Sequence, residues 1–180
     1  MQFLIETERL ILRSLTLEDI NGMFELNSNP AVQRFVGNQP IKSLSEAKEN
    51  IEFITAQYLI NGVGRLAVIE KETGDFLGWG GLKLITEEIN GHYDFYELGY
   101  RFLPKHWGKG FATEVASASI KYGFEEMKLD VIYAIADVEN HASKKVLEKV
   151  GFKLIQVFDY QGIPHNWFKL PKNDYSFRLQ

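Results

Sequence analysis

A strand that leads directly into a glycine-bearing loop and then a helix constrains this chain more than any other feature. Residues 93–103 are rich in aromatic and apolar side chains and end at Pro104. The segment 105–114 then reads Lys-His-Trp-Gly-Lys-Gly-Phe-Ala-Thr-Glu, and we expect the helix that it opens to reach about Met127. The first turn of a helix has N–H groups without internal partners and a locally positive field. The segment therefore predicts an anion site suited to a phosphate or pyrophosphate.

The residues alone leave two interpretations of this loop open. In one, Gly108 and Gly110 let a phosphate approach the backbone, while Lys105 and Lys109 add positive charge. In the other, the glycines serve only the turn. The loop is neither a Walker A motif, since no G-x-x-x-x-G-K-[ST] occurs, nor a dinucleotide fingerprint, since the third glycine is missing.

The rest of the chain predicts one domain, residues 1–180, in which strands and helices are mixed. A Ser-x-x-Glu capping box at Ser43 begins a helix, and Gly151 follows another as its stop signal. This order indicates an α/β or α+β sheet with helices on both faces. We expect strands at 9–13, 66–70, 76–84, 93–103, 131–136, 152–158 and 167–170, and helices at about 16–29, 43–61, 111–127 and 140–150.

Composition excludes several classes of function. Cysteine is absent, which removes disulfide scaffolds, thiolate metal sites and cysteine nucleophiles. The balance of 20 basic and 24 acidic side chains argues against a nucleic-acid partner. The four histidines are scattered, so we expect no metal site. No apolar run of membrane-spanning length and no secretory signal is visible, so we expect no membrane partner and a cytoplasmic location.

The segment 97–114, Glu-Leu-Gly-Tyr-Arg-Phe-Leu-Pro-Lys-His-Trp-Gly-Lys-Gly-Phe-Ala-Thr-Glu, resembles the acetyl-CoA-binding core of the GNAT N-acetyltransferase superfamily. It is most similar to the branch of ribosomal-protein N-terminal acetyltransferases. Segments 7–13 and 140–152 agree, so the likeness covers nearly the whole chain in the expected order. One departure is Lys105, where the family usually has Arg or Gln; lysine keeps the charge but not the forked geometry.

The resemblance implies a mixed, mostly antiparallel central sheet that is splayed at the acetyl-CoA cleft, with helices on both faces. It also implies that Asn140 hydrogen-bonds the pantetheine arm and that Ser143 lies near the thioester sulfur. The alternatives are a plain helix cap for Asn140 and a tolerated small residue for Ser143. The implied acetyl-CoA-binding residues, with no metal, are Phe102, Leu103, Lys105, Trp107, Gly108, Lys109, Gly110, Phe111, Ala112, Asn140 and Ser143.

The implied reaction is direct transfer of an acetyl group from acetyl-CoA, a co-substrate, to a primary amine. An amine must lose a proton to attack; at pH 7 roughly a tenth of an α-amine is already neutral, but under about a thousandth of a lysine is. Glu97 is the candidate general base, acting through water, with a solvated strand charge as its alternative. Leu147 stands where many members have a tyrosine that protonates the sulfur, so Ser143 is the candidate acid.

The acceptor is expected to be a protein N-terminal amine, such as that of a ribosomal protein, or a small-molecule amine. The candidate acceptor-binding residues are Phe35, Tyr96, Tyr160 and Trp167, with Trp79 and Tyr93 as further aromatic candidates; core packing is the alternative for all of them. A monomer or homodimer is expected. Two other functions stay open, a non-catalytic acyl-CoA-binding or sensor module and a nucleotide-phosphate binder of another type. Glu97, Asn140 and Ser143 favour the enzyme.

Overall fold

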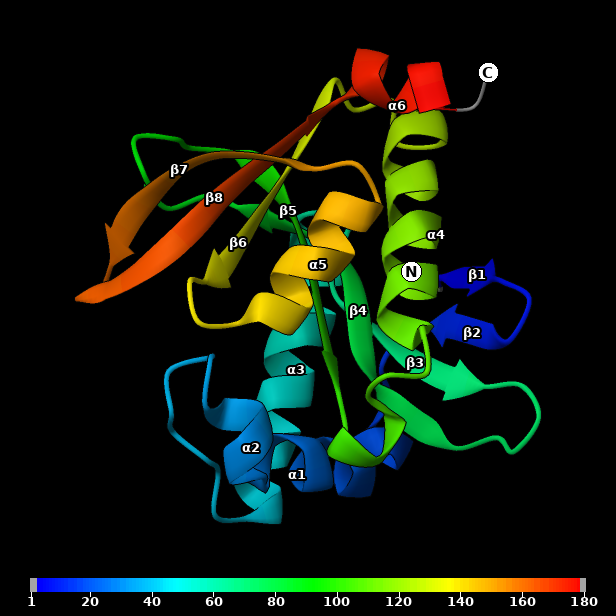
Figure 1. Cartoon of the computed structure of the whole chain (residues 1–180). Helices are drawn as coiled ribbons and strands as arrows, with labels where there is room; N and C mark the ends of the chain where they lie inside the picture. The colour runs from blue at the N-terminus through cyan, green and yellow to red at the C-terminus, as the bar shows by residue number, and fades with distance from the viewer. Residues whose placement is uncertain (1–2, 179–180) are drawn as a thin grey trace.

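The computed structural model describes residues 3–178, which contain one eight-stranded sheet (Figure 1). Its strands pair antiparallel throughout, except that β5 and β6 run parallel. The order across the sheet is β1 (Leu4–Glu6), β2 (Leu10–Arg13), β3 (Leu66–Glu70), β4 (Phe76–Ile85), β5 (Phe95–Phe102), β6 (Val131–Asp137), β8 (Ile163–Pro171) and β7 (Lys153–Tyr160).

Helices cover both faces of the sheet (Figure 1). On one face, Leu82 and Leu98 of the sheet pack against α4 and α5. On the other, Ala67 packs against α1, α2 and α3. α6 follows β8 and packs its Tyr175 against Phe124 of α4. This arrangement confirms the predicted mixed sheet with helices on both faces. The helices are α1 (Ile20–Ser28), α2 (Pro30–Gln33), α3 (Leu44–Ile60), α4 (Phe111–Glu125), α5 (His141–Lys149) and α6 (Lys172–Arg178), with 3₁₀ turns at Leu17–Asp19 and Pro104–His106.

Side-chain alternation along β5 determines which residues face which helices. Leu98 and Phe102 belong to the apolar clusters that include α4. Glu97 and Arg101 lie on the opposite face, where Arg101 reaches Asn27 of α1. One strand therefore presents apolar groups to the α4–α5 layer and charged groups to the α1–α3 layer.

The sheet is interrupted between its two parallel strands. β5 and β6 share only the register pair Glu97–Tyr133, although β5 continues to Phe102 and β6 to Asp137. The backbone of this part of β5 is therefore not covered by a neighbouring strand on that side. The chain leaving β6 enters α5, whose first turn faces the gap (Figure 1).

Capping and stop residues in the sequence explain where the long helices begin and end. The Ser43 hydroxyl accepts from the backbone N–H of Glu46 at 3.3 Å, as in the predicted capping box, but the Glu46 carboxylate accepts from the N–H of Lys42 at 3.2 Å instead of that of Ser43. Gly151 has φ +109° immediately after α5 ends. Short elements were not predicted from the sequence, namely β1, α2, α6 and the 3₁₀ turn at Pro104–His106. The 3₁₀ turn at Leu17–Asp19 begins the helix expected at 16–29 and has Thr16 as its N-cap. β8 begins four residues before the expected strand at 167–170.

Candidate active site

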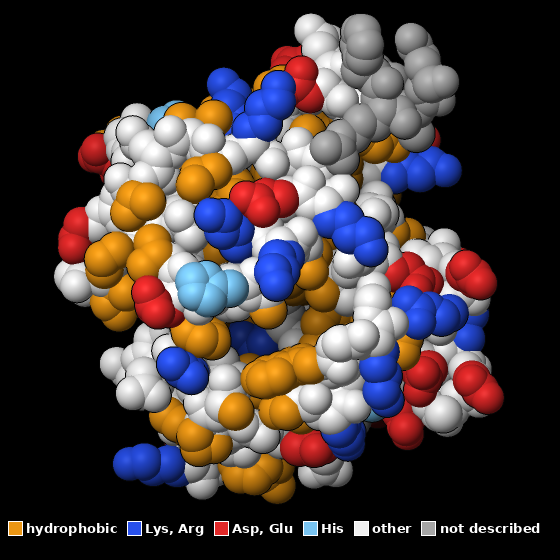
Figure 2. Space-filling model, viewed as in Figure 1, with side chains coloured by type: hydrophobic (Ala, Val, Ile, Leu, Met, Phe, Trp, Pro, Cys, Tyr) orange, Lys and Arg blue, Asp and Glu red, His pale blue; other side chains and the backbone are white. Residues whose placement is uncertain are grey.

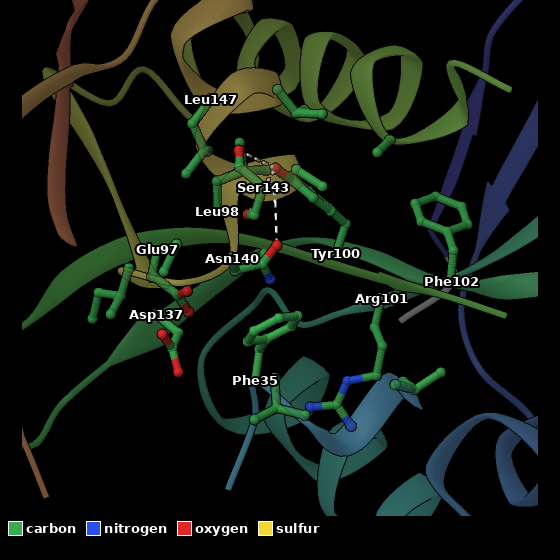
Figure 3. A pocket seen from close by; sticks show the side chains of 18 of the residues that line it. Phe35, Glu97, Leu98, Tyr100, Arg101, Phe102, Asp137, Asn140, Ser143 and Leu147 are labelled. Atoms are coloured by element: carbon green, nitrogen blue, oxygen red, sulfur yellow. Dashed lines mark hydrogen bonds between the residues drawn. The ribbon is translucent and has the colours of Figure 1, made fainter. Parts of the chain in front are cut away.

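A cavity of about 1000 Å³ lies where β5 and β6 part. The space-filling view shows it as a hollow with a Lys or Arg side chain at its bottom (Figure 2), and the close-up shows the side chains that line it (Figure 3). It brings together residues from the glycine loop, β5, α2 and α5 that are far apart in the sequence. The predicted site residues that line it are Phe35, Glu97, Phe102, Trp107, Gly108, Gly110, Phe111, Ala112, Asn140, Ser143 and Tyr160.

The glycine loop offers main-chain donors to this cavity. Gly108 and Gly110 have φ of +74° and +83°, a left-handed conformation that glycine adopts at little cost. A Cβ at Gly108 would meet nothing within 4 Å, so space for a ligand lies beside the backbone. Gly110 is the N-cap of α4 and no side chain caps the helix there. Within the described part of the chain, the loop therefore leaves main-chain N–H groups without partners at the positive end of α4, an arrangement that suits an anion.

Hydrogen bonds from Thr7 and Arg9 fix the position of this loop. The Glu114 carboxylate, in the first turn of α4, accepts from the Thr7 hydroxyl at 2.6 Å and from Arg9 Nε at 2.7 Å. Arg9 Nη1 also donates to the carbonyl oxygen of Lys109 at 3.0 Å. Burial raises the pKa of Glu114, but the hydrogen bonds from Thr7 and Arg9 outweigh it and lower the pKa overall. Its negative charge is thus paired, although it lies near a predicted anion site.

The two loop lysines lie outside the cavity lining. Lys105 Nζ is 3.2 Å from Glu25 Oε1 on the surface, and Lys109 is exposed. Between them His106 is buried beneath the loop, with its ring 6.3 Å from that of Phe111. Burial and the two lysines lower the pKa of His106. The loop thus places its lysines at the rim and a neutral imidazole beneath.

A hydroxyl pair lies on the α5 side of β5. Asn140 caps α5 by accepting the Ser143 N–H at 3.0 Å, while among residues 3–178 its Nδ2 group has no hydrogen-bond partner. Ser143 Oγ is 3.2 Å from Tyr100 Oη, so the two hydroxyls share a hydrogen bond (Figure 3). Burial raises the pKa of Tyr100 to about 12, with the Ser143 hydrogen bond opposing. Asn140 therefore caps α5 while its Nδ2 group remains available as a donor. The Ser143 hydroxyl shares a hydrogen bond with the Tyr100 hydroxyl.

A carboxylate lies on the other face of the same strand. Glu97 Oε2 forms an ion pair with Arg65, whose guanidinium also donates to the carbonyl oxygens of Gly81 and, at 2.8 Å, of Glu97. Gly99 makes this possible, because a Cβ there would lie 2.5 Å from Arg65 Nη2. In the described part of the chain nothing donates to Glu97 Oε1. One carboxylate oxygen is fixed and the other is available to a water or an amine.

Several predicted site residues lie away from the cavity. Leu103 is buried in the core beneath α1–α3. Tyr96 packs against the core beneath α4 and α5. Trp167 is 1% exposed and packs its ring against those of Phe95, Tyr133 and Phe158, because β8 turns it toward that aromatic cluster. These three side chains do not line the cavity.

Among the cavity-lining residues that sequence reasoning missed, three contact candidate residues directly. They come from β5 and the segment before β3. The available signal was the presence of two arginines among apolar strand residues, where an unpaired charge is rarely buried. The aromatic residue Trp79 was noted, but not that both guanidinium groups lie over its ring. These three residues are Arg65, Tyr100 and Arg101, whereas Trp79, named above as an aromatic candidate, also lines the cavity.

The fold and the site together define an acetyltransferase of the GNAT class, and comparison with known families agrees. Residues 9–153 match the family described as "Acetyltransferase (GNAT) domain". The chain therefore belongs to the GNAT family of acetyl-CoA-dependent N-acetyltransferases.

Curated relatives are named as enzymes of this kind. The chain is 32% identical over 167 residues to the uncharacterized N-acetyltransferase YoaA of Bacillus subtilis, with 91% of this chain and 92% of that one covered. It is 36% identical to the uncharacterized N-acetyltransferase p20 of Bacillus licheniformis, covering 82% and 80%. It is 28% identical to the spermidine N(1)-acetyltransferase of Escherichia coli K12, covering 79% and 72%.

Solved structures share the fold. A GNAT-family acetyltransferase from Bacillus anthracis is 25% identical with a TM-score of 0.80, covering 95% of this chain and 99% of that one. The ribosomal L7/L12 α-N-protein acetyltransferase RimL, solved in complex with coenzyme A, is 17% identical with a TM-score of 0.80, covering 94% and 98%. Across residues 3–178, no helix is long and apolar enough to cross a membrane, and no group of three acidic or histidine side chains is placed to hold a metal ion.

Proposed function

We propose that this chain binds acetyl-CoA along the α4–α5 side of the gap in the sheet and acetylates a primary amine bound on the α1–α2 side. The main-chain donors around Gly110 would hold the pyrophosphate, and the Asn140 Nδ2 group would donate to the pantetheine arm. Acetyl-CoA supplies a thioester carbonyl that an amine can attack, so that a C–N bond forms and the C–S bond breaks.

The observation that supports this proposal most is the placement of two proton-handling groups on opposite faces of β5. Glu97 faces the α1–α3 layer and Ser143 reaches β5 from the α5 side, and both line one cavity (Figure 3). Glu97 Oε1 would take a proton from the attacking amine, through a water. The Ser143 hydroxyl would donate a proton to the departing sulfur and be resupplied by Tyr100. No observation favours the non-catalytic alternative.

The proposed acceptor rests on the aromatic lining of the cavity and on the activities for which the relatives are named. Phe35 and Tyr160 contribute aromatic surface to the cavity. Relatives that share the family act on spermidine, and one that shares the fold acts on the N-terminus of a ribosomal protein, as their names state. An amine of one of these kinds, attached to a small molecule or to a protein N-terminus, is the proposed acceptor.

Release of free coenzyme A thiol tests this function. The wild-type protein is assayed with acetyl-CoA and a panel of N-terminal peptides, amino acids, polyamines and aminoglycosides. We expect release that depends on at least one class of amine. In Glu97→Gln we expect kcat to fall by about 10²-fold or more, as for loss of a general base.

The matched control is Glu52→Gln, which removes an exposed carboxylate on α3 and should leave the rate unchanged. Thermal unfolding and acetyl-CoA affinity of Glu97→Gln check that the loss of the Arg65 ion pair has not unfolded the cavity. If no amine in the panel increases the release of coenzyme A by the wild-type protein, the proposed function is contradicted.

A further inference from the structure

Arg101 is a cation that faces the cavity without a carboxylate partner. It lies on the same face of β5 as Glu97, and its Nη1 donates to the neutral amide oxygen of Asn27 at 2.7 Å. Its guanidinium carbon is 4.9 Å from the centre of the Trp79 ring. Within residues 3–178 no carboxylate pairs with Arg101, and its buried Nε has no hydrogen-bond partner.

The guanidinium of the neighbouring Arg65, in contrast to that of Arg101, has a carboxylate partner. Arg65 is paired with Glu97 and with two carbonyl oxygens, and its guanidinium carbon is 5.5 Å from the same Trp79 ring. Two guanidinium groups thus contact the ring of Trp79, but only Arg65 is paired with a carboxylate. Burial and repulsion by Arg65 lower the pKa of Arg101 to about 10, which still leaves it protonated at neutral pH.

The charges of the cavity are divided between its two sides. The carboxylates of Glu97 and Asp137 lie on one side of the pocket, and Arg101 points in from the other, toward Phe35 (Figure 3). Glu97 is already ion-paired with Arg65, so only its Oε1 is left to accept from an amine. Arg101 has no carboxylate partner among residues 3–178, so its side of the pocket suits an anion. In total the lining contains Arg65, Lys83, Arg101 and Lys145 against Glu87, Glu97 and Asp137.

We infer that the acceptor is a primary amine that also bears a carboxylate, which Arg101 binds while the amine lies at Glu97. The inference rests on the proposed function, because it names the substrate class of the same site. Leaving donors of a buried guanidinium unpaired is costly, and a carboxylate in the cavity can accept charge-assisted hydrogen bonds from its terminal nitrogens. The same charge repels a polyamine, so the chain should differ in specificity from its spermidine-acetylating relatives.

Matched acceptors test the inference. Coenzyme A release is measured with β-alanine and β-alaninamide, with Asp-Ala-amide and Asn-Ala-amide, and with spermidine. In each pair only the carboxylate differs, and the two pairs separate a free amino acid from an acidic N-terminal residue. We expect kcat/KM to favour the carboxylate member of at least one pair by about tenfold or more, and to be lowest for spermidine.

Variants of Arg101 test whether this residue causes the preference for acceptors that bear a carboxylate. Arg101→Met should reduce the preference to about one, and Arg101→Lys, which keeps charge but loses the fork, should give an intermediate value. Lys48→Met is the control, because it removes an exposed cation of α3 that does not line the cavity. An equal rate with acid and amide, or a preference that survives Arg101→Met, overturns the inference.

A binding measurement separates this inference from the proposed function. Succinate is titrated against the fluorescence of Trp79, with Trp79→Phe showing which part of the signal that residue supplies. We expect saturable binding that Arg101→Met weakens by tenfold or more. If succinate binds in this way while no amine is acetylated, the anion site stands and the proposed function fails. Binding that is equal in the two proteins, or found in neither, overturns the anion site.

Discussion

The Tyr100 hydroxyl is the proposed replacement for the proton donor that the α5 sequence lacks. The position where many family members have a tyrosine is Leu147, which cannot donate a proton. The structure brings a phenol from β5 to within 3.2 Å of Ser143 Oγ instead. Because burial raises the pKa of Tyr100 to about 12, the phenol stays protonated at neutral pH and can act as a donor. Alternation along β5 indicates which face Tyr100 occupies, but its contact with α5 joins residues 43 positions apart and could not be read from the sequence.

Removing either hydroxyl should slow transfer without preventing acetyl-CoA binding. In Ser143→Ala and Tyr100→Phe we expect kcat to fall by about 10²-fold, within the usual range for acid–base assistance, while the Kd for acetyl-CoA changes little. The loss should shrink when the acetyl donor is a thioester of a more acidic thiol, because its thiolate leaves without a proton. Tyr122→Phe, a partly buried tyrosine of α4 outside the cavity lining, is the control. Unchanged kcat in both variants would show that these hydroxyls handle no proton.

At the scale of elements, the start of α4 is fixed by a segment more than 100 residues earlier. Thr7 and Arg9 hold the Glu114 carboxylate, and Arg9 holds the loop carbonyl of Lys109. This explains why the segment 7–13 belongs to the same family likeness as the loop. The positions of the loop donors therefore depend on the turn between β1 and β2 as well as on the glycines.

Glu114→Gln should destabilise the protein in a pH-dependent way. Because the pKa of Glu114 is lower in the folded state, its contribution is present above the unfolded pKa of about 4.3 and is lost as the pH falls through the folded value. Arg9 is 43% exposed, so we expect a modest loss of about 1–2 kcal/mol at pH 7. Urea unfolding at pH 7 and pH 3 measures it, with the exposed Glu148→Gln as control. A loss that is equal at both pH values would contradict the ionised pairing.

The elements that the sequence did not predict are short or lack a periodic pattern. β1 has three residues and α2 has four, so neither shows a full repeat, and isolated pieces of this length are stable only through tertiary contacts. The long helices and the paired strands were predicted because their caps, turns and apolar spacing are local. Gly151 and the Ser43 cap are examples.

Across the whole molecule, the two sides of the cavity differed in how well they could be predicted. The cofactor side lies in one continuous segment, 97–114, together with the start of α5, so a motif describes it. The acceptor side brings Asn27, Arg65 and Arg101 together from three segments. Trp167 illustrates the limit, because its aromatic ring suited a pocket but β8 directs it into the core.

Acetyl-CoA should stabilise the whole fold, since it would contact both sides of the gap between β5 and β6. A ligand at 100 times its Kd adds about 2.7 kcal/mol to the free energy of unfolding. For a chain of this size that corresponds to a rise in Tm of about 5–10 °C. Thermal unfolding with and without acetyl-CoA measures it. A Tm that stays constant at saturating acetyl-CoA would show that the gap is not the binding site.

The most direct test of the account is calorimetric titration of acetyl-CoA into the wild-type protein and Gly110→Asp. An aspartate at this positive-φ position strains the loop and places a negative charge beside the proposed diphosphate. Gly74→Asp is the matched control, because Gly74 has φ +76° in the β3–β4 turn, away from the cavity. We predict one acetyl-CoA per chain for the wild-type and control proteins, and binding at least tenfold weaker for Gly110→Asp. Equal affinity in all three proteins, or none in the wild type, would contradict the assignment of the loop.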